Sequence, residues 1–463
     1  MGLIVDFDPF RVLKESLKKG GEFADLYIED TLNTTIVCEE DRIEKLITGR
    51  QLGAGLRVIS GFKTYYAYSN DLTENGLLKL AQTVSAAARD GASEKRISLA
   101  RRDISQGFPI SIDPLGVSLE EKARLVKDAN RVARGFDKRV CQARVMYGDA
   151  LRDTVVINSD GHWVEERKTA LLFVSFVVAS DGNVTQTGYE SEGGAIGLEL
   201  FDKTSIEDIA VSAARRAVMM LGARSAPAGR MPVVLSSEAG GTMIHEAIGH
   251  GLEADMAMEG MSVYSGKVGE FVASRLITVI DDGTIPFKRG SSFFDDEGTA
   301  TQRIVLVQDG VLKGYMHDRL SAMKAGKTST GNGRRESFRS RPIPRMTNTL
   351  IAPGESDPDS VVRSAAKGLF VKKMGGGQVD TVNGDFVFEV AEGYLIEGGK
   401  VGELVRGATL TGNGPEVLKA IDMVGSDLGF GIGTCGKDGQ GAPVSDAQPT
   451  LRIPDMIVGG KVG

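Results

Sequence analysis

Two histidines and a glutamate lie close together in the segment GGTMIHEAIGHGLEAD, residues 240–255. His245 and His250 are five residues apart, and Glu246 directly follows the first histidine. Neutral imidazole nitrogens bind zinc well, and a helix that carries two histidines is a common way to hold the ion. The pattern HExxxH therefore suggests a metal site, although the HExxH helix of zinc proteases spaces its histidines four residues apart.

The five-residue spacing does not suit a regular α-helix. Such a helix turns by roughly 100° per residue, so residues four apart lie within about 40° of each other, and residues five apart differ by about 140°. Gly249 and Gly251 flank His250 and tolerate backbone conformations that other residues avoid. We predict that the helix ends or bulges near Gly249, as π-bulges do at functional sites, and that this brings His250 towards His245.

Two histidines do not complete a catalytic zinc site, which usually has three protein ligands and one open position. The candidates for the third ligand are Asp255, His317 and Cys435, with Glu253 as a weaker one. Asp255 lies ten residues after His245, the spacing at which metzincins place their third ligand. Cys435 lies in the glycine-rich segment GFGIGTCGKDGQG, and a thiolate binds zinc strongly. The residue chemistry alone favours Asp255 and Cys435 equally.

Glu246 is the predicted catalytic acid and base. Because it adjoins a proposed ligand, its carboxylate can reach a metal-bound water without binding the metal itself. Zinc lowers the pKa of such a water to about 7, and a nearby carboxylate can accept the proton and pass it to the leaving amine. The alternative interpretation of this short motif is a solvent-facing glutamate between two incidental histidines.

The composition is that of an acidic globular protein. A chain of 463 residues is long enough for two or three domains. A net charge of −7 and a pI of about 5.4 argue against nucleic-acid binding, which needs a clustered basic surface. The N-terminus lacks the parts of a signal peptide, and no segment approaches the roughly 18 apolar residues of a membrane span. Three distant cysteines argue against a disulfide framework, so we expect a cytoplasmic protein.

The first half of the chain predicts an antiparallel sheet with helices, an α+β fold. Strands are expected at residues 22–30, 33–47 and 55–70, and a β meander from residue 153 to residue 188. Asp-Gly pairs at 160–161 and 181–182 predict the turns of that meander.

Helices are expected over residues 9–20, from 72 to just before Gly91, from 118 to 135 and over 204–220. Ser118 with Glu121, and Thr204 with Glu207, fit capping boxes in which each side chain bonds a free backbone N–H at the helix start. The segment 222–232 is small, contains proline and has no periodicity, so we place the domain boundary there.

We therefore divide the chain into an α+β domain, residues 1–224, and a mainly antiparallel β domain, residues 225–463. The second domain begins with the strand VVLSS and the helix that carries the histidines. Short strand patterns then dominate, including a hairpin that turns at Asp309-Gly310. A run of short strands predicts a closed or strongly curved, barrel-like sheet.

A basic segment, residues 324–345, contains seven Lys and Arg residues against the single Glu336. Such a run is either a solvated loop or a loop that binds an anionic group such as a peptide carboxylate. For the second case the candidate contacts are Arg334 and Arg335.

Two distant motifs resemble one family. HEAIGHGLEAD at 245–255, followed by GTCGKDGQGAPVSDAQPTLRIPDMIVGG at 433–460, resembles the TldD branch of the TldD/PmbA metallopeptidases. GNGRRES at 331–337 and PRMTNT at 344–349 resemble middle segments of the same family. The resemblance covers nearly the whole chain and its two-domain layout.

The resemblance implies one zinc ion per active subunit, bound by His245, His250 and Cys435, with Glu246 as the catalytic base. It thereby prefers Cys435 to Asp255. It also implies a heterodimer with a related inactive TldE/PmbA-type subunit, or self-association, in which the N-terminal domain serves dimerisation and substrate enclosure. The implied substrates are unfolded or short peptides, including the leaders of modified peptides. His317 becomes a candidate for substrate contact or for support of the metal site, with a structural surface residue as its alternative.

An extended peptide can bind by adding as a strand to an exposed sheet edge, because backbone hydrogen bonds ignore sequence. The glycine-rich segments at 374–380 and 412–416 are either ordinary turns or places of close approach to such a peptide, with Gly376 and Asn413 as candidate contacts. A non-catalytic regulator or adaptor is the alternative function, since some members of the family are named as modulators of DNA gyrase. The cleavage site and the choice between internal and terminal cleavage are not evident from the sequence.

Overall fold

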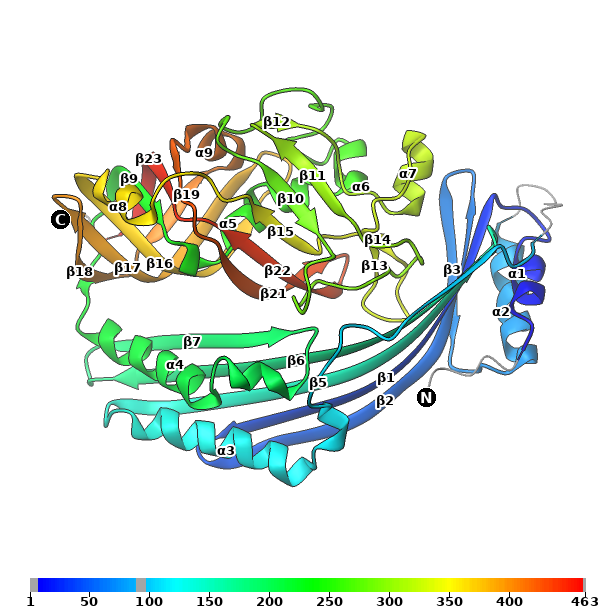
Figure 1. The fold of residues 1–463 in the computed structure, drawn as a ribbon, viewed down its shortest axis with the longest axis horizontal. Coiled ribbons are helices and arrows are strands. Elements are labelled where there is room, and N and C mark those ends of the chain that lie inside the picture. The colour runs from blue at the N-terminus through cyan, green and yellow to red at the C-terminus, as the bar shows by residue number, and fades with distance from the viewer. Residues whose placement is uncertain (1–6, 89–96, 461–463) are drawn as a thin grey trace.

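The N-terminal half of the chain folds around one long, curved sheet (Figure 1). The computed structural model describes residues 7–88 and 97–460. The strands lie in the order β3-β2-β1-β5-β6, all antiparallel, and both β4 and β7 also pair with β6. Their bounds are β1 Phe23–Glu39, β2 Arg42–Ser60, β3 Lys63–Ser69, β4 Arg101–Ser105, β5 Val140–Asn158, β6 His162–Ser180 and β7 Thr185–Gly194.

Four helices pack on this sheet: α1 Pro9–Ser16, α2 Glu74–Ala87, α3 Leu119–Gly135 and α4 Ile206–Leu221. Helix α3 lies against β5 and α4, and α4 lies against β6 and β7. Val126, Ala129 and Ala133 of α3 are fully buried in the shared core. Their spacing by three and four residues gives the helix the single apolar face that such packing requires. The predicted capping box of Ser118 and Glu121 is confirmed at the start of α3.

Three local predictions were wrong. The segment 55–70 is not one strand, because Gly61 and Phe62 adopt positive φ angles of 55° and 60° and turn the chain from β2 into β3. The segment 33–47 is not one strand, because Glu40 and Asp41 adopt positive φ angles of 52° and 60° and turn the chain from β1 into β2. Helix α4 is capped by Ser205, which accepts a hydrogen bond from the N–H of Asp208, and not by Thr204. The second predicted helix ends at Ala87, before Gly91 as expected. The predicted absence of a signal peptide concerns the N-terminal residues, of which 1–6 lie outside the described ranges.

The C-terminal half contains a small closed barrel. Strands β16, β9, β23, β19 and β17 pair in that order, and β16 pairs back to β17. The predicted α+β class and the barrel-like C-terminal sheet are therefore confirmed. The bounds of the barrel strands and the strands attached to them are β8 Arg224–Ser225, β9 Gly229–Leu235, β16 Lys367–Val379, β17 Asp385–Glu397, β18 Lys400–Arg406, β19 Thr409–Asn413, β20 Met423–Val424 and β23 Leu451–Gly459.

A second sheet of six strands packs beside the barrel, in the order β12-β11-β10-β15-β22-β21. Asp309 and Gly310 both have positive φ angles between β11 and β12, which confirms the predicted turn. The bounds of its strands are β10 Val279–Asp282, β11 Arg303–Gln308, β12 Val311–Leu312, β15 Asn348–Ile351, β21 Gly429–Lys437 and β22 Gln440–Gln448. Two short strands, β13 Gly333–Arg334 and β14 Ile343–Pro344, form a separate pair. The C-terminal half also contains the helices α7 Arg319–Ala325, α8 Pro358–Arg363 and α9 Gly414–Ala420.

The basic segment lies between the two halves of the molecule. Phe338 is fully buried against Tyr27 and Val156 of the N-terminal sheet, and its N–H donates to the Glu29 carboxylate at 2.9 Å. Gly53 makes room for this ring, because a Cβ at Gly53 would lie 2.4 Å from it. A solvated loop is therefore the wrong interpretation for the middle of the segment, which docks the C-terminal half onto the N-terminal sheet.

A buried ion-pair network crosses the same interface. Arg57 on β2 is fully buried; its Nε donates to Asp25 at 2.8 Å, and its Nη1 lies 2.6 Å from Glu297 of the C-terminal half. Burial of a charge is costly unless partners surround it. Removal of Arg57 would leave Glu297 without a cation among the described residues and Asp25 with Arg335 alone, at 3.8 Å. Among residues 7–88 and 97–460, no helix has the length and apolar composition of a membrane span.

We expect Arg57→Met to lower the free energy of unfolding by about 3–5 kcal/mol, because it removes the cation paired with Glu297 and the nearer of the two paired with Asp25. The measurement is urea unfolding followed by circular dichroism. Arg230→Met is the matched control, since the pair of Arg230 with Asp455 is solvent-exposed, and its effect should stay below about 1 kcal/mol. Equal effects of the two substitutions would contradict this account.

Candidate metal centre

The histidine segment is not a regular helix. A short α-helix, α5 Thr242–Ile244, continues into a π-helical turn over His245–Gly249 and a 3₁₀ turn over His250–Leu252. The N–H of His250 donates to the carbonyl of His245, five residues back. Because that wider turn closes after five residues, the two imidazoles share one side of the helix, with ring centroids 4.9 Å apart. The predicted deformation near Gly249 is confirmed.

Packing and side-chain hydroxyls hold the deformed segment in place. A Cβ at Gly249 would lie 2.2 Å from the sulfur of Met346, so only glycine lets the turn pack this closely. The hydroxyl of Tyr264 donates to the carbonyl of Ala247 at 2.8 Å, and Ser262 donates to the carbonyl of Gly251 at 2.7 Å. These bonds satisfy carbonyl groups that an irregular helix would otherwise leave buried and unpaired.

The hairpin of β21 and β22 brings Cys435 to the histidines. Candidate ligand atoms of His245, His250 and Cys435 all lie within 4.8 Å of one another, and the Cys435 sulfur is 3.4 Å from Nε2 of His250. Two imidazoles and a thiolate are a donor set that zinc accepts, and their spacing fits a single ion. Asp255 does not join them, because its carboxylate binds Lys437 at 2.6 Å.

Carboxylates orient both imidazoles. Nδ1 of His245 lies 2.8 Å from Asp446, and Nδ1 of His250 lies 3.2 Å from the buried Glu253. These contacts leave Nε2 of each ring for the shared centre, an arrangement common around metal-binding histidines. Sequence reasoning missed Asp446. The Asp438-Gly439 pair, which turns β21 into β22, was the available signal, because the resulting hairpin sets Asp446 opposite Gly431.

The electrostatics of the cluster favour a thiolate. Burial raises the pKa of the Cys435 thiol, but hydrogen bonds to His245 and His250 outweigh burial and lower the pKa to about 6. Burial likewise raises the pKa of Glu253, and the neighbouring His250, Lys437 and Arg345 outweigh it, so the Glu253 carboxyl stays ionised. Burial lowers the pKa of each imidazole, but Asp446 outweighs it at His245 and Glu253 at His250, and the pKa of His250 rises to about 10. Metal binds neutral imidazoles and a deprotonated sulfur, so a metal ion would have to displace the imidazole protons.

A cleft of about 450 Å³ opens over the cluster. Glu246 lies in its wall, half-buried and directly beside His245. The opposite wall is the glycine-containing end of β16, residues 377–379, and the floor runs along β21 from Ile432 to Lys437. The cleft therefore combines a three-donor cluster, a free carboxylate and two strands.

Models of three domains match nearly the whole chain: PmbA/TldA metallopeptidase domain 1 at residues 24–88, the central domain at 112–221 and the C-terminal domain at 228–460. A protein of Haemophilus influenzae named "Metalloprotease TldD homolog" is 39% identical over 95% of this chain and 93% of its own length. The chain belongs to the TldD/PmbA family of metallopeptidases. A protein of Saccharolobus solfataricus named "Zinc metalloprotease TldD homolog" is 27% identical over 98% of this chain and all of its own length.

Solved structures share the fold of this TldD/PmbA chain. A putative modulator of DNA gyrase from Thermotoga maritima has a TM-score of 0.77 at 21% identity and covers 94% of this chain and 96% of its own. TldE from Thermococcus kodakarensis has a TM-score of 0.75 at 19% identity and covers 96% of this chain and 97% of its own. At these identities the likeness concerns the fold alone.

The residues predicted from the sequence to contact the substrate do not line the cleft over the histidines and Cys435. Arg334 is buried and donates to the carbonyls of Met346 and Pro443, and Arg335 stacks over the ring of Tyr27, 4.2 Å from its centroid. Asn413 bonds the turn before β17. Gly376 lines a cavity that adjoins the cleft.

His317 is buried away from the cleft. Its exposed fraction is 3%, its Nδ1 lies 3.2 Å from the hydroxyl of Ser321, and its Nε2 has no hydrogen-bond partner among the described residues. Burial, and then the nearby Lys327, lower the pKa of His317 to about 4. The folded protein therefore holds this imidazole neutral.

We expect the fold to lose stability as the pH falls from about 6.5 towards 4, because the unfolded chain protonates His317 and the folded chain does not. From pH 7.5 to pH 5 the contribution of His317 should be about 2 kcal/mol. The measurement compares urea unfolding of the wild type and His317→Gln at both pH values. The variant should show a smaller loss, and an identical loss would refute the assignment.

Proposed function

We propose that the chain is a zinc peptidase whose ion is held by His245, His250 and Cys435. The observation that carries the proposal is the convergence of these three side chains from segments 185 residues apart. The chemistry that zinc supplies at such a site is that of a Lewis acid. Neither Asp255 nor Glu253 competes for the third position, because Asp255 is held by Lys437 and Glu253 by His250 and Lys437.

Glu246 is the proposed catalytic base. It lies in the cleft wall beside His245, and no hydrogen bond or ion pair to another described residue occupies its carboxylate. A carboxylate in that position can take the proton of the attacking water and return it to the leaving amine. Its free carboxylate also distinguishes it from Glu253, whose oxygens orient His250.

Unfolded or short peptides, such as leader segments and unstructured fragments, are the proposed substrates. The cleft lies along strands whose backbone groups can bond an extended chain without reading its sequence. A folded domain cannot enter a cleft of about 450 Å³. The N-terminal half, which curves beneath the C-terminal half in Figure 1, is the proposed enclosure for the substrate.

A related subunit of the TldE type is the proposed partner, since a TldE structure shares this fold and the family resemblance implies a heterodimer, with self-association as the alternative. We place the protein in the cytoplasm, because its three cysteines are all free. A regulatory role like that named for the Thermotoga protein would not require cleavage, so the substitution of Glu246 also tests it.

Glu246→Gln should reduce kcat for an unstructured peptide by about 10²–10⁴-fold and leave the zinc content unchanged, because the carboxylate moves a proton and does not bind the ion. Cys435→Ser should instead lose the ion, as measured by mass spectrometry of the purified protein. Cys141→Ser is the matched control, since Cys141 is exposed, forms no disulfide and lies on β5, where its thiol donates to the carbonyl of Val178. Full peptidase activity of Glu246→Gln would contradict the mechanism. A cellular phenotype that survives the loss of cleavage would favour the regulator.

Asp446→Asn should weaken zinc affinity by about 10–100-fold, because the amide can no longer fix the tautomer of His245 as the carboxylate does. Affinity is measured by competition with a chelator of known strength. Asp455→Asn, an exposed aspartate paired with Arg230, serves as the control and should leave affinity unchanged. Equal zinc affinity in Asp446→Asn and wild type would remove Asp446 from the site.

A further inference from the structure

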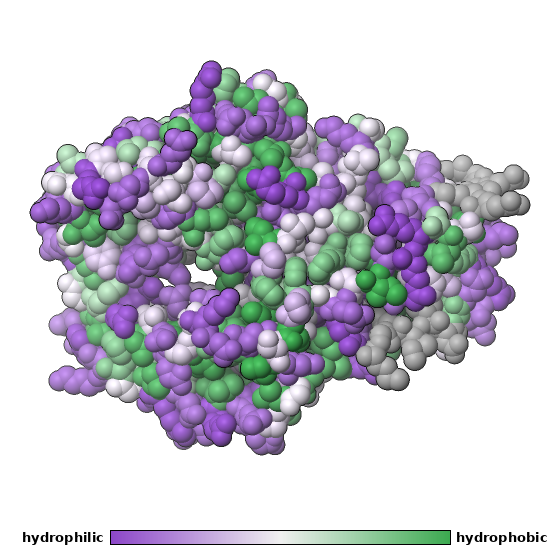
Figure 2. Space-filling model, viewed as in Figure 1, coloured by the Kyte–Doolittle hydropathy of each residue, from purple (hydrophilic) through white to green (hydrophobic). Residues whose placement is uncertain are grey.

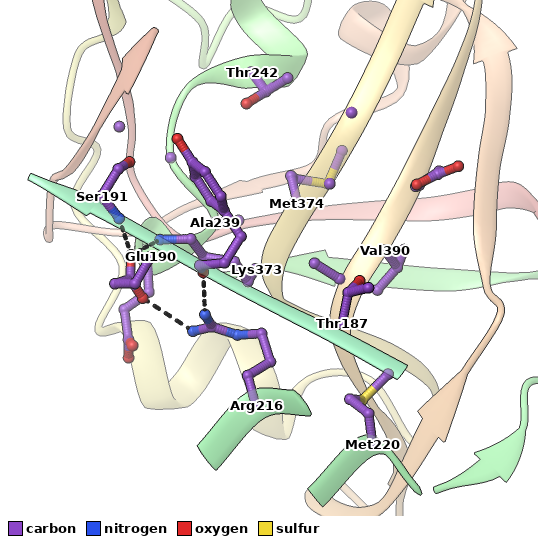
Figure 3. A pocket seen from close by; sticks show the side chains of 18 of the residues that line it. Thr187, Glu190, Ser191, Arg216, Met220, Ala239, Thr242, Lys373, Met374 and Val390 are labelled. Atoms are coloured by element: carbon purple, nitrogen blue, oxygen red, sulfur yellow. Dashed lines mark hydrogen bonds and ion pairs between the residues drawn. The ribbon is translucent and has the colours of Figure 1, made fainter. Parts of the chain in front are cut away.

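Two cavities between the N-terminal sheet and the C-terminal half differ in how their cations are paired. The larger one, of about 670 Å³, adjoins the cleft over the histidines, and the hollow between the two halves is visible on the face shown in Figure 2. Figure 3 shows that Lys373 and Arg216 both approach Glu190 there, at 2.6 Å and 3.2 Å. Both of these cations therefore have an anionic partner within the chain.

The second cavity, of about 530 Å³, is called the lysine cavity here, after Lys168. One wall is a single face of the N-terminal sheet, to which β5 contributes Arg152 and β6 contributes Lys168. The opposite wall comes from the segments 292–296 and 334–340 of the C-terminal half. Arg339 lines the cavity and is exposed to solvent, so a small molecule can enter.

Two cations face each other in the sheet wall. Lys168 on β6 and Arg152 on β5 are direct cross-strand partners, and like charges in such positions repel each other. Arg152 is compensated by Glu29 at 3.3 Å and by Asp296 at 3.7 Å. Lys168 forms no hydrogen bond or ion pair with any residue of the ranges 7–88 and 97–460. Only one of the two neighbouring cations is therefore paired.

Two carboxylates attract Lys168 from a distance, but their oxygens bond other groups. Glu166 accepts hydrogen bonds from the backbone N–H groups of residues 293–294, at 2.8 Å and 3.3 Å. Asp296 accepts a hydrogen bond from the backbone N–H of Arg335 at 2.8 Å. Neither carboxylate thus forms an ion pair with the lysine.

The surroundings of Lys168 disfavour its positive charge. Burial, and then repulsion by Arg334, lower the pKa of Lys168 to about 8. Arg152 acts in the same direction, and together these effects outweigh the attraction by Glu166 and Asp296. An anion beside the ammonium would remove this cost, because an opposite charge favours the charged form.

We propose that the lysine cavity binds the oxyanion group, a carboxylate or a phosphate, of a small molecule, with the anion beside Lys168. Its volume is within the range of small-molecule sites, about 300–1,000 Å³. Phe294 and Pro443 offer apolar contacts to the remainder of the ligand. No residue that lines this cavity also lines the cleft over the histidines, so the site does not depend on the proposed peptidase function.

Isothermal titration calorimetry with inorganic phosphate and with succinate tests the site. Lys168→Met should weaken the binding of the anion by about 10–100-fold, because it removes one charged partner. Lys45→Met, on the exposed part of β2, is the matched control and should bind like the wild type. Binding of only one anion would support the proposal and identify the group as phosphate or carboxylate. Equal affinity in Lys168→Met and the wild type, or no binding of either anion to the wild type, would overturn it.

The stability of Lys168→Met separates binding from a structural role of the lysine. Without an anion, this variant should unfold at the same or a higher urea concentration than the wild type, because the repulsion by Arg152 is gone. Unfolding at a clearly lower concentration would show that Lys168 already has a stabilising partner in the chain and would overturn the proposal.

Two further titrations locate the anion. The affinity of the wild type for succinate should fall by about tenfold from pH 7 to pH 9, because Lys168, with a pKa of about 8, loses its proton. A constant affinity over this range would contradict the assignment of Lys168. Cys435→Ser should bind both anions as tightly as the wild type does. Loss of binding in that variant would place the anion on the metal and overturn the proposal.

Discussion

The hydrogen bond from the N–H of His250 to the carbonyl of His245 decides the geometry of the candidate metal centre. In a regular α-helix, the five-residue spacing would turn the two imidazoles about 140° apart. The wider π turn brings the two side-chain directions back onto one side of the helix. Its cost is a set of displaced carbonyl groups, which the hydroxyls of Tyr264 and Ser262 satisfy, and a tight contact with Met346 that only Gly249 permits.

The candidate metal centre also requires that the hairpin of β21 and β22, distant in the sequence, lie against the π turn. Strands β21 and β22 pair over their full nine residues, so the position of Cys435 is fixed relative to Asp446 on the neighbouring strand. One hairpin thus supplies both a sulfur donor and the carboxylate that orients His245. Arg345 donates to the carbonyl of Cys435, and Lys437 compensates the buried Glu253, so the hairpin is tied to the histidine segment by charge as well as by packing.

Local chemistry made part of this site predictable. Gly249 beside His250 indicated the deformation of the helix, and HExxxH indicated the two proposed metal ligands that the helix carries. The choice between Cys435 and Asp255 was not available from residue types, because it depends on Lys437, whose contact with Asp255 spans 182 positions. The family resemblance made that choice, and the geometry agrees with it.

The fold, like the site, was predictable where neighbouring residues determine the structure and unpredictable where distant contacts do. Asp-Gly turns and the apolar face of α3 were evident from the sequence, since both depend on neighbouring residues. The turn at Glu40 and Asp41 was not, because neither residue is a glycine or asparagine. The basic segment was misread for a third reason: its charge pattern does not reveal that Phe338 inserts into a space left by Gly53 on a strand nearly three hundred residues earlier.

Among the described residues, no strand pairs with the outer edge of β21 or with the end of β16 that borders the cleft. This bears on how a peptidase can coexist with folded proteins. Backbone groups of a native protein are already bonded within its own helices and sheets, so they have little to offer an unpaired edge. A chain that has lost its structure presents those groups freely. Selectivity for damaged or unfinished chains would then follow from the backbone chemistry of the cleft itself.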